Sequence, residues 1–280
     1  MKKIAAFLLA LLLCSCAVLA ESDEDYDIEY DVEYVLDENN EIVTVESSET
    51  NESSNAAESA EEVLSARDDL INRIIDLGHS LYVKADGKSQ RAHYKSDIYV
   101  CKNFTTYLFR QNRDDFCMAE YPDVQLLVPN NLSSSKSKPY SYGIEWEDIS
   151  AADGNPFYIA AQFKYDTSLS EEENMALACE FMRQAQRGDY FQMSAKYEYG
   201  TGAHSTIMLG YDAETDEIHW MDSNMRGGKK NGIRYGIVQY DEVKSVEWWA
   251  SAFCKKTRGA TLYRLRDDIV YREGHEPEKK

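Results

Sequence analysis

Two residues of this sequence, Cys101 and His204, have neighbours that suit nucleophilic chemistry. Cys101 stands where a helical pattern begins, with Phe104 and Leu108 on its apolar face. The first turn of a helix offers unpaired backbone N–H groups and the positive end of the helix dipole, and both stabilise a thiolate. His204 opens an apolar strand further along the chain. Because a cysteine nucleophile is activated by an adjacent base, we predict Cys101 as the nucleophile and His204 as its base.

Asp222 and Asn224 are predicted to orient His204. The strand that begins at His204 is followed by a polar turn and a second strand, which ends at these two residues. If Tyr211 faces Glu217 across the turn, His204 lies directly opposite Asn224, and Asp222 lies on the diagonal, with Cα atoms roughly 7–8 Å apart. A carboxylate or an amide there would fix the tautomer of the imidazole, as the third group of a catalytic triad does. We expect Asp222 to contribute more, because only it supplies charge. A slip of one residue would turn these side chains to the other face.

The other histidines lack such neighbours in the sequence. His219 alternates with Met221 and is predicted to point away from His204, and no partner is predicted for His79, His93 or His275. No Cys/His spacing is typical of a zinc site, and no glycine-rich loop suggests a phosphate site. We therefore predict neither a metal nor a cofactor.

The elements that must position these residues begin with helices. Apolar residues at helical spacing predict a helix from about residue 63, which Gly78 ends or bends, and a second helix that starts near Cys101. The capping box Ser170-Glu171-Glu172-Glu173 opens a third helix, for which Gly188 is a suitable C-terminal stop.

Strands dominate the later part of the chain. Between the second and third helices, residues 112–169 contain several prolines and are predicted to form loops with short elements. Strands are predicted at residues 190–199, 205–211, 217–223 and 233–240, followed by a helix over about 242–254 and a closing strand at 261–265. This order predicts an α+β domain with helices packed on one face of an antiparallel sheet.

The first twenty residues have the pattern of an export signal. Two lysines precede ten apolar residues, Ile4 to Leu13, a run too short for a stable membrane-spanning helix. Two cleavage sites remain open. Leu13-Cys14-Ser15-Cys16 resembles a lipobox, which would leave a lipid anchor on Cys16, whereas Val18-Leu19-Ala20 suits ordinary signal peptidase. Either site predicts an extracytoplasmic protein, as a cell-envelope lipoprotein or as a secreted or periplasmic protein.

Charge divides the rest of the chain. The net charge is −20, but residues 21–62 alone hold seventeen Asp or Glu and no Lys or Arg, so residues 63–280 carry only −5. We predict an acidic disordered spacer over residues 21–60, one folded domain over 61–268 with an insertion at about 112–169, and a polar tail over 269–280. No basic stripe in the sequence argues for nucleic acid.

Cysteine usage leaves two alternatives. Cys101, Cys117, Cys179 and Cys254 follow the predicted signal. An even number of cysteines in an oxidising compartment is typical of disulfides, here two. Catalysis requires instead that Cys101 remain a free thiol.

Four short motifs occur in an order shared with a known group of enzymes. Cys101-Lys102-Asn103-Phe104 has the form Cys-x-x-Phe, and the segment Leu77–Tyr82 is one residue longer than Leu-Gly-x-x-Tyr. Gly188-Asp189 precedes the strand of His204, and Asp222-Ser223-Asn224 follows it. In these features the chain resembles the bacterial NlpC/P60 and CHAP cysteine peptidases and amidases. It departs from their pattern where Val100 replaces the usual Asp before the cysteine and Asp222 replaces the common Glu.

The resemblance implies an α+β fold with a papain-like core, in which N-terminal helices pack on an antiparallel sheet. It implies a cysteine peptidase or amidase that hydrolyses peptide or amide bonds, with peptidoglycan as the substrate and no cofactor. Cys101, His204, Asp222 and Asn224 would be the catalytic residues. Two alternatives remain open: a catalytically silent papain-like lipoprotein that binds wall fragments or a protein partner, and a transglutaminase-like acyltransferase.

Overall fold

The computed structural model describes residues 64–92, 98–128, 151–197, 200–224, 229–256 and 258–277. The predicted export signal and acidic spacer lie outside the described residues, as do His93 and much of the predicted insertion. The described part combines helices with antiparallel strands, so the predicted α+β class is confirmed.

Helices occupy both halves of the chain, and the strands are concentrated in the second half. The elements in chain order are α2 (Ala66–Ala85), β1 (Gln90–Ala92), α3 (Cys101–Asn112), the 3-10 turn η1 (Arg113–Asp115), β2 (Phe116–Met118), the 3-10 turn η2 (Ala151–Asp153), β3 (Phe157–Lys164), α4 (Glu171–Met182), β4 (Tyr190–Tyr197), β5 (Gly200–Asp212), β6 (Glu217–Asn224), β7 (Lys229–Lys230), β8 (Ile233–Ser245), α5 (Val246–Phe253), β9 (Gly259–Leu265) and β10 (Ile269–Tyr271).

The main sheet is built around a meander. Its strands lie in the order β1-β8-β6-β5-β4-β9-β3, with β7 paired to β8, and every pairing is antiparallel. Strand β3 lies at one edge, so part of the predicted insertion belongs to the main sheet. Strand β10 pairs with β2 in a small second sheet. The predicted polar tail from residue 269 therefore begins with a strand.

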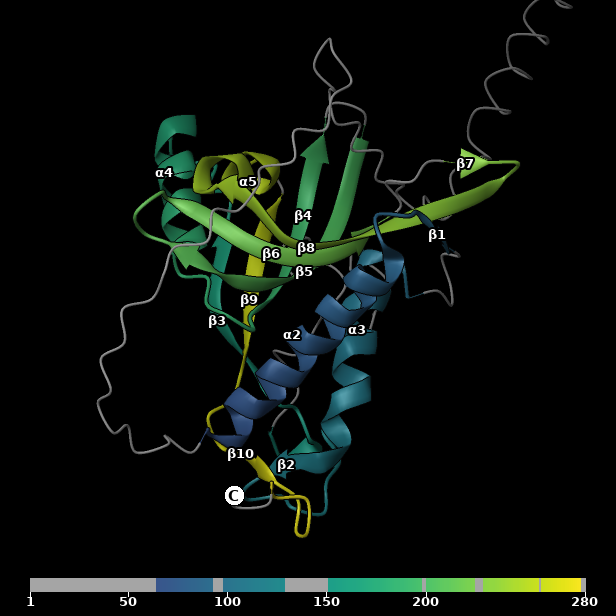
Figure 1. The fold of residues 1–280 in the computed structure, drawn as a ribbon. Coiled ribbons are helices and arrows are strands. Elements are labelled where there is room, and N and C mark those ends of the chain that lie inside the picture. The colour runs from purple at the N-terminus through teal and green to yellow at the C-terminus, as the bar shows by residue number, and fades with distance from the viewer. Residues whose placement is uncertain are drawn as a thin grey trace, which may run out of the picture.

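Helices cover both faces of the sheet, which corrects the prediction of a single covered face. Ile207 and Tyr190 belong to a core that includes residues of α2 and α3. Their neighbours in sequence, Met208 and Phe191, belong to a second core with residues of α4 and α5. Because successive side chains of a strand point to opposite faces, the two helix pairs lie on opposite sides of the sheet. Figure 1 shows α2 and α3 side by side, apart from α4 and α5.

Helix α2 runs through Gly78, which does not end it. The residue is buried, and an ideal Cβ there would lie 2.5 Å from the sulfur of Met221 in β6. A side chain at this position would have to displace the end of the Met221 side chain, and the helix continues to Ala85.

The ends of the later elements follow from local capping. The predicted capping box is confirmed: Ser170 and Glu173 bond reciprocally to each other's backbone at the start of α4. The helix ends at Met182, well before Gly188, which adopts φ 88° and packs against Ile71. Gly188 is therefore a residue of close packing and not the predicted helix stop.

Helix α5 is shorter than the predicted 242–254, because β8 extends to Ser245. The hydroxyl of Ser245 accepts a hydrogen bond from the backbone N–H of Trp248 at 3.2 Å and caps the helix. The other predicted strands are confirmed, with ends shifted by a few residues.

Gly78→Val should destabilise the domain, because the larger side chain would collide with Met221. Overpacking of a closed core costs about 1–3 kcal/mol, and we expect a loss of this size in the free energy of unfolding measured with urea. Ser80→Val, at an exposed position of the same helix, is the matched control and should have a much smaller effect. Equal stability of the two variants would show that α2 and β6 do not depend on close approach at Gly78.

Candidate active site

Cys101 is the first residue of α3, as its helical pattern predicted. Val100 at the N-cap supplies no side-chain cap, and the first helical hydrogen bond runs from the Phe104 N–H to the Val100 carbonyl at 2.8 Å. The residue is 6% exposed. The backbone N–H groups of Lys102 and Ser205 donate hydrogen bonds to its sulfur. The helix start therefore surrounds the sulfur with donors that favour a thiolate.

His204 lies between Cys101 and Asp222. Its Nε2 is 2.6 Å from Oδ2 of Asp222, and the side chains of His204 and Asp222 are 5% and 0% exposed. An ionised carboxylate can only accept, so Nε2 carries the proton of this bond. The imidazole also interacts with the side chain of Cys101, and Nδ1 is the ring nitrogen that Asp222 does not contact. The structure thus brings three of the four predicted site residues into one hydrogen-bonded row.

The turn that joins β5 to β6 differs from the predicted one. Tyr211 pairs with Ile218, not with Glu217, which pairs with Asp212. The turn consequently comprises the four residues 213–216. Taken alone, this shift of one residue would have turned the predicted site residues to opposite faces.

A β-bulge cancels that shift before the site is reached. The register changes between Met208 and Gly210, where Leu209 is the extra residue of β5. Beyond the bulge Ile207 pairs with Met221, which is the register assumed from the sequence. Bulges are known to redirect side chains near functional sites. Here the bulge returns the strand of His204 to the correct face.

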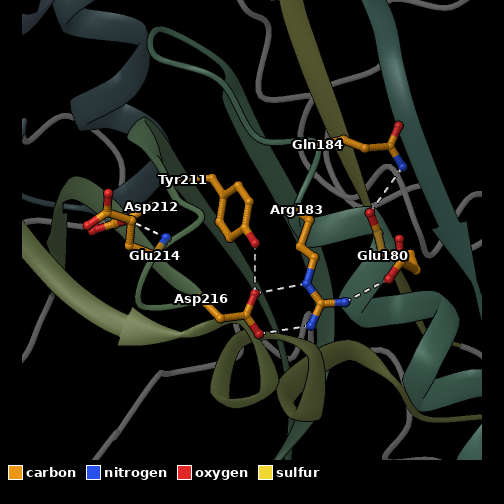
Figure 2. Close-up of polar contacts among 7 residues, drawn as sticks. All are labelled: Glu180, Arg183, Gln184, Tyr211, Asp212, Glu214 and Asp216. Carbon is orange, nitrogen blue, oxygen red and sulfur yellow. Dashed lines mark hydrogen bonds and ion pairs between the residues drawn. The ribbon is translucent and has the colours of Figure 1, made fainter.

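An ion-pair cluster fixes the turn, as Figure 2 shows. Arg183 at the end of α4 donates two hydrogen bonds of 2.8 Å to the carboxylate of Asp216, whose φ of 57° lies in the left-handed region. The hydroxyl of Tyr211 donates to the same carboxylate at 2.9 Å, and Arg183 also donates to Glu180 at 2.7 Å. Bidentate arginine–carboxylate pairs fix geometry as well as charge. The cluster therefore holds the turn that sets the register of β5 and β6.

The β5–β6 ladder ends at the Ile207–Met221 pair. Past this point β6 continues to pair with β8, where Asp222 faces Gln239 and Asn224 faces Ile237. The end of the ladder leaves the backbone N–H of Ser205 available to the thiol of Cys101. Asn224 is 2% exposed, two residues beyond the aspartate that bonds His204.

The remaining described histidines lie elsewhere, although they have partners that the sequence did not suggest. His219 Nδ1 is 2.7 Å from Asp241, which agrees with its predicted orientation away from the site. His79 stacks on Tyr240 with ring centroids 4.6 Å apart. His275 Nδ1 is 2.8 Å from Asp115. None of these three contacts includes Cys101, His204 or Asp222.

The electrostatics of the site favour an ion pair. Burial by itself would raise the pKa of the Cys101 thiol, but the hydrogen bond and charge of His204 outweigh it, and the pKa is lowered. Burial would lower the pKa of His204, but its bonds to Asp222 and Cys101 raise it to about 9. Opposite charges in contact stabilise each other's ionised form. Each of the two groups therefore shifts the pKa of the other toward the ionised form.

The other cysteines differ from Cys101. All four cysteines past the predicted signal are free thiols, so the alternative with two disulfides is not what the structure shows. Burial raises the pKa of Cys117, Cys179 and Cys254. Cys101 is thus the one of the four whose surroundings favour the thiolate.

A contact between Tyr99 and Gly236 supports the nucleophile and was missed from the sequence. An ideal Cβ at Gly236 would lie 2.4 Å from the backbone oxygen of Tyr99, two residues before Cys101. Strand β8 therefore packs directly on the backbone that leads into α3. A lone glycine within a strand pattern signals such close approach, and this signal was present at Gly236.

Comparison with known proteins gives no match: no protein-family model fits the chain, and no curated protein is significantly similar to it. Among the residues that the structure describes, none of the helices is long and apolar enough to cross a bilayer. In the same residues no group of three or more His, Cys, Asp or Glu is arranged to hold a metal ion. The site is thus characterised by its own geometry.

Cys101 should be alkylated by iodoacetamide faster than the other three cysteines at neutral pH, because only its pKa is lowered. Its rate should rise with pH through that lowered pKa and then stay level while His204 is protonated, up to a pH of about 9. Asp222→Asn removes a bond that raises the His204 pKa, so the imidazolium loses stability and the acid limb of the Cys101 profile should move to higher pH. Mass spectrometry of each labelled cysteine measures these rates.

Asn224→Ala is the matched control for Asp222→Asn and should leave the acid limb in place, because it removes no charge. A shift with Asn224→Ala and none with Asp222→Asn would reverse the roles of the two residues and make the site closer to a Cys-His-Asn arrangement.

Gly236→Ala should slow the alkylation of Cys101 by about tenfold to a hundredfold, because its methyl group displaces Tyr99 and the start of α3. Val238→Ala, in the same strand, removes volume instead and should leave the alkylation rate near that of the native chain. Circular dichroism verifies that both variants fold. If Gly236→Ala folds and reacts at the native rate, the Tyr99 contact does not position the nucleophile.

Proposed function

We propose that this chain is an extracytoplasmic cysteine hydrolase with a papain-like core, which cleaves peptide or amide bonds, with peptidoglycan as its substrate. One observation carries the proposal: Cys101, His204 and Asp222 form a buried hydrogen-bonded row with the thiol at the start of a helix. This is the arrangement of nucleophile, base and orienting group of a catalytic triad.

In the first step the Cys101 thiolate attacks the carbonyl carbon of the substrate amide. His204 gives its Nδ1 proton to the nitrogen as the C–N bond breaks, so an amine leaves and a thioester remains on Cys101. Asp222 accepts the hydrogen bond of Nε2 throughout. It thereby holds the imidazole in the tautomer and orientation that the transfer requires.

In the second step a water molecule attacks the thioester. The neutral His204 takes a proton from this water, the C–S bond breaks, and a carboxylic acid leaves. The thiolate and the imidazolium are restored together, so the next cycle starts from the same ion pair. Both steps need only groups of this chain and water.

The negative oxygen that forms in each step needs hydrogen-bond donors. The backbone N–H groups of the first turn of α3 are suitable, because no side chain caps this helix. The replacement of the usual Asp by Val100 has a consequence here. An acidic N-cap side chain would accept hydrogen bonds from these same groups, whereas valine leaves them to the reacting atoms.

The papain-like core and the substrate class rest on the sequence resemblance. The order of elements supports it: a helix that begins with the cysteine precedes an antiparallel sheet, in which the histidine and the aspartate lie on adjacent strands. The segment Leu77–Tyr82 lies in α2, which packs beside α3.

A second candidate function is a catalytically silent protein that binds wall fragments or a protein partner. The burial of the site favours it, because Cys101 and His204 are only 6% and 5% exposed. The lowered pKa of Cys101 favours catalysis instead, since a purely structural thiol gains nothing from a proton acceptor.

Incubation of the purified chain with peptidoglycan fragments should yield an amine and a carboxylic acid, which mass spectrometry identifies. Cys101→Ala should abolish the products and retain the fold, because it removes only the attacking atom. Binding of the fragments without cleavage, equal in both proteins, would support the silent binder. Addition of glycine methyl ester distinguishes a hydrolase from an acyltransferase. An acyltransferase would form a new amide with this amine, whereas a hydrolase would form the carboxylic acid.

A further inference from the structure

Strands β1 and β7 and residues 233–240 of β8 form what we call the basic ribbon. Arg91 of β1 faces Tyr235, and Lys230 of β7 faces Ile233, so two distant parts of the chain meet on β8. Figure 1 shows this end of β8, with β1 and β7 along it, extending sideways from the rest of the sheet. The ribbon is therefore a projecting extension of the strand that supports the site.

The charge of the basic ribbon is opposite to that of the chain. The residues of the basic ribbon, Gln90–Ala92, Lys229–Lys230 and 233–240, contain four Lys or Arg and no Asp or Glu, in a protein with a net charge of −20. In the structure Arg91 and Lys230 are exposed, and Arg234 is half-buried. The pairing of distant segments thus gathers positive charge that the sequence alone does not show as a stripe.

The basic ribbon is continuous with the candidate active site. Ile237 of the ribbon pairs with Asn224, and Gln239 pairs with Asp222. Gly236 packs on the backbone of Tyr99, two residues before the nucleophile. The ribbon is therefore part of the strand that pairs with the segment of Asp222 and Asn224 and packs on the backbone leading to Cys101.

We propose that the basic ribbon binds the substrate, and that this substrate is a peptide-like chain with several carboxylates beside the bond to be cleaved. The proposal rests on the proposed function, because it assigns the substrate class of the same site. Side chains on one face of a strand repeat every two residues, roughly 7 Å apart. An extended peptide has the same repeat. Arg91 and Lys230 face Tyr235 and Ile233, which are two residues apart on β8, so two alternate acidic side chains of a bound peptide match these two cations.

Nucleic acid fits the basic ribbon less well. Single-stranded nucleic acid is held by aromatic side chains on which bases stack, in addition to cations. Tyr235, the aromatic residue opposite Arg91, has the ammonium of Lys230 over its ring at 5.9 Å from the centroid. Its ring is therefore already in contact with a cation of the ribbon.

Binding of fluorescein-labelled hexaglutamate to the full chain, measured by fluorescence anisotropy, tests the proposal. Arg91→Gln/Lys230→Gln removes two exposed cations and should weaken binding about tenfold or more at about 20 mM salt. Lys255→Gln/Lys256→Gln removes two exposed cations after α5 and is the matched control, with unchanged binding expected. Hexaserine should not bind to any of the three proteins.

Hexaglutamate should also slow the alkylation of Cys101 by neutral iodoacetamide in the native chain, but not in Arg91→Gln/Lys230→Gln. Equal binding by both double variants overturns the proposal, as does binding to the ribbon that leaves the alkylation of Cys101 unprotected. Tighter binding of a thymidine oligonucleotide through the same two residues would assign the ribbon to nucleic acid instead. If iodoacetamide does not select Cys101 at all, the proposed hydrolase fails, while the anisotropy experiment still tests the ribbon.

Discussion

The buried hydrogen bond between His204 and Asp222 is the interaction on which the arrangement of this fold depends. A carboxylate with no solvent exposure is strongly unfavourable unless a charged or hydrogen-bonding partner neutralises it. The imidazole of His204 is that partner, at 2.6 Å. The bond requires β5 and β6 to place the two side chains next to each other on the same face. It also requires the hydrogen-bonded ladder between these strands to end before the site, so that the thiol of Cys101 can reach His204. The bulge, the turn cluster and the glycine contacts all serve this requirement.

Much of the candidate site could be predicted from the sequence because its signals are local. The helix start at Cys101 and the capping box at Ser170 depend on residues within a few positions of each other. The choice of Asp222 over Asn224 as the partner of His204 followed from charge alone. The structure shows Asp222 hydrogen-bonded to the imidazole of His204. The predicted register, however, was correct at the site for the wrong reason. The turn is one residue shorter than assumed, and the extra residue Leu209 compensates, so two deviations cancelled.

The features that sequence reasoning missed depend on contacts between distant parts of the chain. Gly78 looked like a helix end because glycine disfavours helices, but the helix continues through it, and the residue packs beside Met221, far along the sequence. Strand β3 lies among loops and acquires its structure from pairing with β9. Helices cover both faces of the sheet because apolar side chains such as Met208 point to the second face. The sequence shows that Met208 is apolar but does not show to which face it points. None of these contacts has a periodic signature within its own segment.

The bulge at Leu209 shows that the face on which His204 lies depends on whether the number of residues between the turn and His204 is odd or even. A strand has only two faces, so each inserted or deleted residue between the turn and His204 exchanges them, and a second change restores them. The length of the turn and the presence of the bulge are therefore coupled. A related sequence can change one of them only if it also changes the other. Lineages of this fold should therefore differ between Ile207 and Met221 by compensated pairs of insertions and deletions, even where one change lies in the turn and the other in the strand.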